Sequence, residues 1–222
     1  SEKLAHMGQL SAGIAHELNN PLGVITMYSN ILKEECGPEH PYASDLALIV
    51  EQTDRCRNIV GGLLNFARKN QVRLKETNIE NFINQSVKSL IVPDNVEVKI
   101  VSRIDDPMIN IDREQMMQAI TNLEKNAVEA MPAGGTLKIE IDGNDNYVDI
   151  KVVDTGMGIP EKHMEKLFTP FFTTKQIGKG TGLGLPQVYG VVKMHRGKIR
   201  VESNTISDSG PTGSTFYLTL PR

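Results

Sequence analysis

The stretch His16-Glu17-Leu18-Asn19-Asn20-Pro21 belongs to the long helical pattern that decides the fold of the first part of the chain. Apolar residues recur around it at spacings of three and four, which is the pattern of a helix with one apolar stripe. At about 100° per residue, His16 points away from that stripe and Asn20 shares its face. Glu17 lies beside them, so we expect an imidazole, a carboxylate and an amide to face solvent together.

These three side chains suit nucleophilic chemistry. A carboxylate next to a histidine can accept its ring N–H, which fixes the tautomer and makes the other ring nitrogen a better nucleophile. The alternative is a surface histidine on a solvated polar face, with Pro21 only kinking the helix. This segment alone favours neither interpretation, and the rest of the chain decides between them.

The composition is that of an ordinary globular chain. It has 222 residues, a net charge of −3 and no run of basic residues, so we expect no nucleic-acid binding. The sequence lacks an apolar run of about 18 residues, which predicts no membrane contact by this segment. Cys36 and Cys56 fit neither a metal site nor a disulfide framework, so we expect reduced thiols in a cytoplasmic protein. The chain starts without Met inside a helical pattern, and we expect an upstream segment, which could attach the full-length protein to a membrane.

Two long helical patterns predict a hairpin. The first runs from about Ser1 to Glu35 and ends at a turn rich in Gly and Pro at residues 36–41. The second carries an apolar stripe from Leu46 to Ala67. A lone hairpin leaves one side of each stripe open to water, so we expect a homodimer that forms a four-helix bundle. Packing against the second half of the chain is the alternative.

From residue 77 the pattern changes to short strands and helices. A helical pattern follows Asn78, and Asp112 suits the N-cap of a helix that runs to about Met131. Strands are expected at residues 96–101, 108–111, 136–141, 147–154, 198–203 and 214–220, with a further helix at about 183–194. We therefore predict an α+β multidomain chain. It has a helical hairpin over residues 1–70, a hinge over 71–76 and a two-layer α/β sandwich over 77–222.

Polar residues on the helix after Asp112 suit a cation that is bound together with phosphates. Asn122 and Asn126 are four residues apart and lie off the apolar side of this helix. Two amide oxygens at this spacing can hold Mg²⁺ or its waters. The alternative is a polar helix edge, which is the commoner role of such a pair.

Glycine-rich segments follow in the second half. Asp154-Thr155-Gly156-Met157-Gly158-Ile159 comes directly after a strand, and its carboxylate can accept a hydrogen bond from an exocyclic amine such as that of adenine. Its glycines would let the backbone approach a flat ligand. The stretch 178–185 leads into a helix, so its backbone N–H groups suit di- or triphosphate. Between the two, the aromatic segment 167–175 ends on Lys175, which could reach a phosphate; the alternative is that its phenylalanines are core residues.

Taken together, these motifs resemble those of sensor histidine kinases. Residues 16–21 resemble their H-box, residues 122–130 their N-box, residues 168–172 their F-box, and residues 154–158 and 180–184 their two glycine boxes. The order and spacing of the motifs match over nearly the whole chain. The residues of the H-box and the stretch Phe-Phe-Thr-Thr-Lys are similar to those of the nitrogen-regulation branch of the family. The resemblance implies a dimerisation and phosphotransfer hairpin followed by a Bergerat-type ATP-binding domain.

The resemblance also implies a role for each motif. His16 would attack the γ-phosphate of ATP while Glu17 accepts its proton, and an aspartate of a response regulator would then take the phosphoryl group. Glu17 and Asn20 match the pattern that supports phosphatase action on the regulator, so we expect a bifunctional protein. The resemblance implies that Asn126 binds Mg²⁺, with Asn122 beside it. The residues implied at the adenine are Asp154, Gly156, Gly158 and Ile159. Those implied in the lid and around the phosphates are Phe168, Lys175, Gly180, Thr181, Gly182, Leu183 and Gly184.

Two other functions share parts of this pattern. ATPases of the gyrase, Hsp90 and MutL kind resemble it in the nucleotide pocket, but their water-activating Glu would stand where this chain has Asn122, an amide that is no base at neutral pH. A non-catalytic scaffold would keep the hairpin without needing nucleotide.

Glu124 departs from the family, which usually has an apolar residue there. Its helical-wheel angle lies at the margin of the apolar side, so we expect it to be partly solvated and paired with Lys125 or a neighbour.

Overall fold

The computed structural model describes residues 2–68, 72–175, 180–205 and 210–222. For residues 2–17, 55, 58–59 and 61–68 only the backbone is described. The chain divides into two compact units: residues 1–70 together with 171–183, and residues 71–170 together with 184–222.

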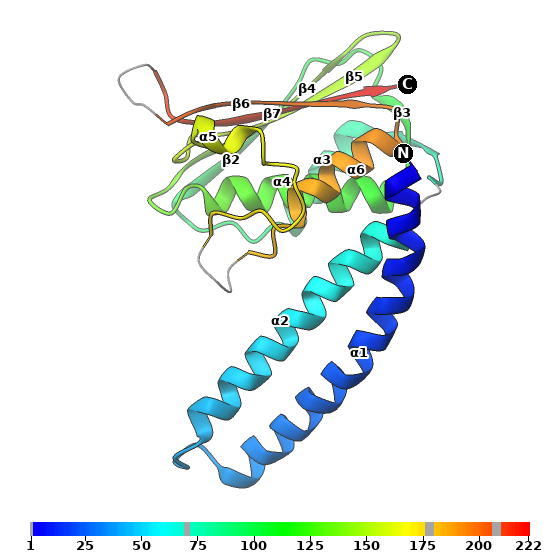
Figure 1. Ribbon diagram of the computed structural model, residues 1–222. Helices are drawn as coiled ribbons and strands as arrows, with labels where there is room; N and C mark the ends of the chain where they lie inside the picture. Colours follow the sequence, from blue (N-terminus) through cyan, green and yellow to red (C-terminus); the bar gives the residue numbers. More distant parts are fainter. Residues whose placement is uncertain (1, 69–71, 176–179, 206–209) are drawn as a thin grey trace. The chain divides into compact units, whose positions relative to one another are not determined.

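The first unit contains a helical hairpin (Figure 1). Helix α1 spans Glu2–Cys36 and helix α2 spans Ala43–Arg68, close to the two predicted patterns. Gly37 adopts the left-handed conformation, with φ 72°, and its N–H donates to the Lys33 carbonyl at 3.2 Å. This is a common way to end a helix, because glycine takes that conformation without a Cβ penalty. The turn predicted at residues 36–41 is therefore confirmed.

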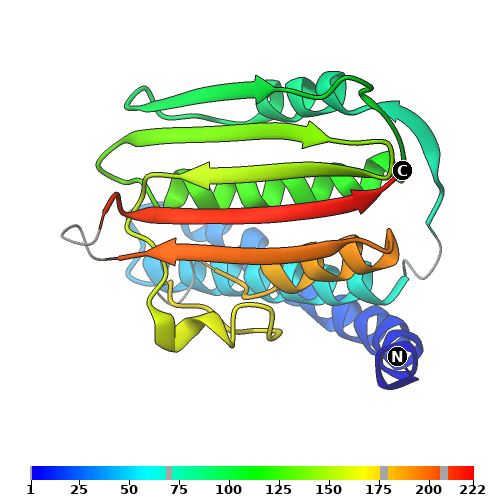
Figure 2. The ribbon, with the colours of Figure 1, turned by 90° about the horizontal axis from the view of Figure 1, so that it is seen from above.

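The second unit is built on a five-stranded mixed sheet (Figure 2). Its elements are β1 (Lys75–Asn78), α3 (Ile79–Ser89), β2 (Val96–Ser102), β3 (Met108–Ile111), α4 (Arg113–Glu129), β4 (Gly135–Gly143), β5 (Tyr147–Asp154), α5 (Glu161–Met164), α6 (Gly184–Met194), β6 (Lys198–Asn204) and β7 (Gly213–Pro221). The strand order is β2-β4-β5-β7-β6; β2 runs parallel to β4, and the other neighbours are antiparallel. The predicted fold class is confirmed.

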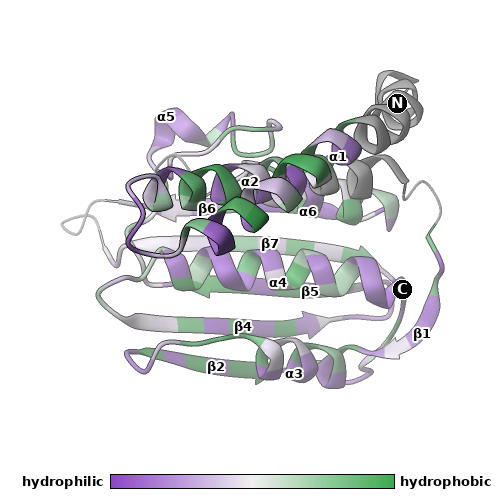
Figure 3. Cartoon of the chain, turned by 90° about the horizontal axis from the view of Figure 1, so that it is seen from below, coloured by the Kyte–Doolittle hydropathy of each residue, from purple (hydrophilic) through white to green (hydrophobic). Residues whose placement is uncertain are grey.

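Helices α3, α4 and α6 lie on one face of this sheet (Figures 2 and 3). Along β4 and β5, buried residues alternate with more accessible ones, which is expected when only one sheet face is covered. The apolar sides of the helices and of the strands form one core. Its largest fully buried members include Phe82, Ile83, Met116, Ile120, Leu123, Ile139 and Ile150.

Residues 75 and 76, at the end of the predicted hinge, belong to a strand. Lys75 and Glu76 begin β1, which pairs antiparallel with β3 through partners such as Thr77 and Ile109. A four-residue strand with a charged start has too little alternation to be recognised from its own residues. Its pairing with β3 decides its structure.

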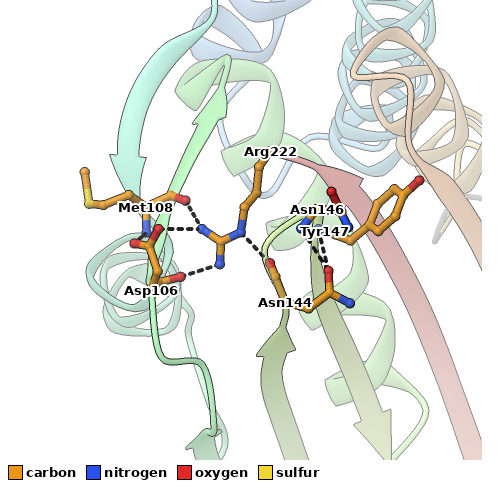
Figure 4. A network of polar contacts seen from close by, with 6 residues as sticks. All are labelled: Asp106, Met108, Asn144, Asn146, Tyr147 and Arg222. Atoms are coloured by element: carbon orange, nitrogen blue, oxygen red, sulfur yellow. Dashed lines mark hydrogen bonds and ion pairs between the residues drawn. The ribbon is translucent and has the colours of Figure 1, made fainter.

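Arg222 fastens one edge of the unit (Figure 4). Its guanidinium donates through Nε to the Asn144 carbonyl at 2.7 Å, and through its two terminal nitrogens to the Asp106 carboxylate and carbonyl at 3.1 and 2.5 Å. The Arg222 backbone N–H also donates to the Asn146 carbonyl at 3.1 Å. The β4–β5 turn is thereby held against the segment that leads into β3.

The environment predicted for Glu124 was wrong. Its side chain is 0% exposed on the core side of α4 and accepts a 2.7 Å hydrogen bond from the Ser86 hydroxyl of α3. Burial raises the pKa of Glu124 to about 7, against a smaller lowering by the Ser86 hydrogen bond. Helix α3 covers the margin of the apolar side of α4, which a helical wheel of α4 alone cannot show.

In the described part of the chain, no helix combines the length and apolar character needed to cross a membrane. Cys36 and Cys56 are both free thiols; Cys36 is half-buried and Cys56 is exposed.

Candidate nucleotide-binding and phosphoacceptor site

Helix α4 positions the two asparagines of the predicted cation site. Its first turn is fixed by Asp112, whose carboxylate accepts from the backbone N–H groups of Glu114 and Gln115, both at 3.1 Å, as predicted for an N-cap. Asn122 and Asn126 lie about one turn apart and are both half-buried. The Asn122 amide nitrogen donates to Gln187 of α6 at 3.1 Å, so its carbonyl oxygen is the atom left to face a ligand.

Asp154 ends β5 and is 6% exposed. Its Oδ1 accepts from the backbone N–H of Gly156 at 2.9 Å and of Ser214 at 3.2 Å. Burial raises the pKa of Asp154, and these two hydrogen bonds oppose the rise. Within the described residues Oδ2 has no hydrogen bond, so it is the atom that can accept from an amine.

The loop after Asp154 folds tightly onto the ends of α4 and β6. The Met157 N–H donates to the Ala130 carbonyl at 3.1 Å, and the Ile159 N–H donates to the Ser203 hydroxyl at 2.7 Å. A Cβ on Gly156 would lie 2.4 Å from the Ala130 carbonyl oxygen, and one on Gly158 would lie 2.2 Å from the Asn204 carbonyl oxygen. Both glycines are therefore required for close backbone packing within the protein. Contact of these glycines with a flat ligand stays a prediction.

Sequence reasoning missed the residues that support this loop. Ser203 binds Ile159, and Ser214 lies opposite Asp154 in the β5–β7 register. A Cβ on Gly213 would lie 2.0 Å from the Asp154 carbonyl oxygen, so β7 approaches Asp154 at a glycine. These contacts depend on the pairing of β7 with β5 and with β6, for which the sequence holds no local signal.

The glycine segment 180–183 belongs to the first unit. The Phe171 N–H donates to the Gly182 carbonyl at 2.9 Å, and Gly182 adopts φ 66° with its Cα facing the Phe171 backbone. The Leu183 N–H donates to the Thr181 hydroxyl at 3.4 Å, and the Lys175 N–H to the Thr173 hydroxyl at 3.2 Å. Residues 178 and 179 of the predicted phosphate segment lie outside the described residues.

The other predicted site residues divide between the two units. Gly184 begins α6 in the second unit, where its Cβ position would lie 3.8 Å from the Asn122 side chain. In the same unit the Phe168 ring packs on Tyr189 with 5.3 Å between ring centres. His16, Glu17 and Asn20 lie in α1, and Asn20 is exposed. The side chains of His16 and Glu17 lie outside the described ones.

The sheet face opposite the helices carries a separate groove of about 420 Å³. Its polar side chains are mostly engaged with one another: Thr219 binds Asp149, and the Arg200 guanidinium lies 3.9 Å from the centre of the Tyr217 ring. Among the described residues, no cluster of three or more His, Cys, Asp or Glu side chains could hold a metal ion.

Comparison with known families identifies both parts of the chain. The family model described as "Histidine kinase-, DNA gyrase B-, and HSP90-like ATPase" matches residues 111–222, and the "His Kinase A (phospho-acceptor) domain" model matches residues 6–72. The chain belongs to the sensor histidine kinases. The second match separates this kinase from gyrase-like and Hsp90-like members of the same ATPase family, because the phosphoacceptor domain covers the hairpin that contains His16.

Related kinases match the chain along its whole length. Sporulation kinase A of Bacillus subtilis is 36% identical over 227 residues, which are 100% of this chain and 36% of that protein. Full-length ShkA in complex with AMPPNP has a TM-score of 0.75 and 25% identity, covering 96% of this chain and 45% of that one. ThkA in complex with the response regulator protein TrrA has a TM-score of 0.64 and 24% identity over 99% of this chain and 63% of that one, which shows a shared fold. The chain spans 25% to 50% of the length of the curated kinases it matches.

Proposed function

We propose that this chain is the catalytic core of a kinase that transfers the γ-phosphoryl group of ATP to its own His16 and then to an aspartate of a response regulator. The observation that carries the proposal is Asp154. Its Oδ1 is held by two backbone N–H groups, and Oδ2 of this mostly buried residue is left as an acceptor among the described residues. Such an acceptor suits the exocyclic amine of adenine. AMPPNP, an ATP analogue, is bound in the related ShkA structure.

The proposed phosphate and metal ligands come from α4 and from the glycine segment. Asn126 would ligate Mg²⁺, with Asn122 beside it, since the Asn122 amide nitrogen is engaged by Gln187 and leaves the oxygen for a cation. When bound, Mg²⁺ would neutralise charge on the phosphates. The backbone of residues 180–184, with Thr181, would bind the phosphates, and Lys175 and Phe168 would belong to the lid. Phosphoryl transfer needs little covalent help, so these residues would act by positioning and by charge.

The hairpin is proposed to form a homodimeric four-helix bundle. In the single chain many large apolar side chains of α1 and α2 are exposed. They include Val24 at 52%, Ile25 at 46%, Met27 at 50%, Ile31 at 41% and Leu48 at 54%. Apolar surface of this extent on two long helices favours association with a second copy. The proposed domain boundaries are 1–70 for this phosphoacceptor hairpin and 77–222 for the ATP-binding domain.

The pair Glu17 and Asn20 on α1 suggests an additional phosphatase activity toward the regulator. Asn20 is exposed on α1, three residues after Glu17, and its amide could orient a water molecule on the phosphoaspartate. Docking of a receiver domain next to His16 would bring the two reactions to one face of the hairpin. ThkA, which has the same fold, is known in complex with the response regulator protein TrrA.

Incubation with γ-labelled ATP and Mg²⁺ tests the kinase activity. We expect acid-labile label on the native chain, and loss of that label in His16→Gln and in Asn126→Ala. His40→Gln is the matched control, because His40 lies in the turn of the same hairpin and should keep the label. Label that persists in His16→Gln would contradict the proposed phosphoacceptor.

The phosphatase activity needs a separate assay with a phosphorylated receiver domain. We expect Asn20→Ala to slow phosphate release at least about tenfold, which is within the range of one lost general acid–base or positioning contact. Asn30→Ala, at an exposed asparagine of the same helix, is the control. Equal rates for the native chain and Asn20→Ala would exclude the proposed role of Asn20.

A further inference from the structure

His195 is a buried polar residue to which the proposed mechanism gives no role. It lies one residue beyond α6 and is 6% exposed. Its Nδ1 lies 2.8 Å from the Val191 carbonyl of α6, and its Nε2 accepts from the Asp112 backbone N–H at 2.9 Å. Because Nε2 faces a donor and Nδ1 faces an acceptor, the geometry requires the neutral tautomer that carries its proton on Nδ1.

This histidine joins α6 to the start of α4. Helices α4 and α6 pack side by side on the same face of the sheet (Figures 1 and 3). Asp112, the N-cap of α4, contacts His195 just past the end of α6, whereas Asn122 contacts Gln187 near the start of α6. The two helices are therefore antiparallel and joined at two places, about 15 Å apart along α4 at 1.5 Å per residue.

The position of α6 along α4 matters for the nucleotide site. Gly184, the first residue of α6, lies beside Asn122, and the segment proposed to bind the phosphates leads directly into it. Sliding α6 along α4 would move this end relative to Asn122 and Asn126. Apolar packing alone restrains sliding weakly, since it is non-directional, whereas a hydrogen bond between buried groups has a defined geometry. Loss of the His195 acceptor would remove the hydrogen bond that the Asp112 N–H donates inside the protein.

Asp112 also holds the chain segment that enters the second unit. The Arg73 backbone N–H donates to Asp112 Oδ2 at 3.0 Å, and the Gln115 side-chain amide donates to the same oxygen at 2.9 Å. Asp112 therefore holds the entering segment through its carboxylate and α6 through its backbone. The start of α4 is the point at which three segments are fastened to one another.

We propose that His195 is a positioning residue for phosphate and metal binding: by accepting from Asp112 it sets the register of α6 on α4. This inference rests on the proposed function. The proposal distinguishes two parts of the ligand, because the hydrogen bonds that hold the loop after Asp154 run to Ala130 and Ser203, neither of which belongs to α6. His195 should thus affect binding of the triphosphate and not binding of adenosine.

Binding measurements on the whole chain test the proposal. We expect His195→Leu to raise the dissociation constant of a non-hydrolysable Mg²⁺–ATP analogue about tenfold, with the dissociation constant of adenosine changed less than about twofold. His195→Gln can place an acceptor toward Asp112 and a donor toward Val191, and it should restore analogue binding to within about threefold of native. Val192→Ala, which shortens a buried apolar side chain of α6, controls for general loosening of the helix and should keep the native ratio of the two dissociation constants.

A measurement on the native chain covers the case in which His195→Leu does not fold. Coupling between sites is reciprocal, so the Mg²⁺–ATP analogue should slow hydrogen exchange of the Asp112 amide at least about fivefold, whereas adenosine should not. The proposal would be overturned if His195→Leu weakened the binding of the analogue and of adenosine equally. It would also be overturned if Val192→Ala weakened analogue binding as much as His195→Leu, or if the analogue left hydrogen exchange of the Asp112 amide unchanged. A native chain that binds neither ligand would instead refute the nucleotide-binding function on which it rests.

Discussion

Glu124 of α4 and Ser86 of α3 are joined by a 2.7 Å hydrogen bond inside the core, and both side chains are 0% exposed. Glu124 stands between the two asparagines of the proposed cation site in sequence but points to the opposite side of the helix. The carboxyl group is therefore part of the packing of α3 on α4. Its pKa of about 7 makes the stability of this packing depend on pH.

The free energy of unfolding should therefore fall as the pH rises. A carboxyl group whose pKa is higher in the folded state favours folding when it is protonated, so its contribution is complete below about pH 4.5 and is lost as the pH rises through about 7. The difference corresponds to about 3 kcal/mol of unfolding free energy between pH 4.5 and 8. Glu124→Gln, which stays neutral, should lose this decline, and urea unfolding at several pH values would measure it.

Glu129→Gln is the matched control for Glu124→Gln, because Glu129 is an exposed residue of the same helix. Its unfolding free energy should follow the native pH dependence. If Glu124→Gln and the native chain lose stability in parallel between pH 4.5 and 8, the assignment of a buried, neutral carboxyl group is incorrect.

Asp154→Asn should weaken nucleotide binding with little effect on folding. The asparagine retains Oδ1 for the N–H groups of Gly156 and Ser214 but replaces Oδ2 by an amide nitrogen, which cannot accept from adenine. Loss of a hydrogen bond to a charged group predicts a weaker affinity by about 1.5–3 kcal/mol. Calorimetric titration with an ATP analogue would measure this loss. Native affinity in the variant would place the adenine elsewhere.

Gly158→Ala should destabilise the second unit. Gly158 has φ 71°, and an added Cβ would lie 2.2 Å from the Asn204 carbonyl oxygen, so the backbone must shift. Strain of this kind typically costs about 1–3 kcal/mol. Thermal unfolding would show a lower melting temperature. Gly23→Ala in α1 has open space around its Cβ and should instead stabilise its helix by up to about 1 kcal/mol. Equal effects of the two changes would contradict the packing described here.

Ile25→Glu should weaken the proposed dimer. Ile25 lies on the apolar stripe of α1 and is 46% exposed in the single chain, so a charge there would be buried by a second copy. Sedimentation should show a shift toward monomer by at least about tenfold in the dissociation constant. Asn30→Glu adds the same charge away from the stripe and should leave association unchanged. Dimers of native stability in Ile25→Glu would argue against a bundle formed through this stripe.

Local patterns predicted most of the fold. The helix stripes, the glycine turn at residue 37, the cap at Asp112 and the strands β4 and β5 are all encoded within a few residues of where they form. The environment of Glu124 and the existence of β1 were not predictable in this way. Each depends on a segment distant in sequence, namely α3 for Glu124 and β3 for β1.

The candidate site shows the same division. Asp154 and the asparagines of α4 are predicted from residue type and spacing, whereas Ser203, Ser214 and Gly213 act through strand pairing and left no local signal. His195 likewise looks like an ordinary residue at a helix end until Asp112 is placed beside it. Residues that position others are found only when the tertiary contacts are known.

Site mapping by mass spectrometry can show whether His16 receives the phosphoryl group. The chain would be incubated with ATP and Mg²⁺, digested at neutral pH and analysed without acid. We expect one phosphoryl group per chain, located on the peptide that contains His16 and lost on brief acid treatment. Phosphorylation confined to another residue, or acid-stable phosphate on a hydroxyl side chain, would contradict this expectation.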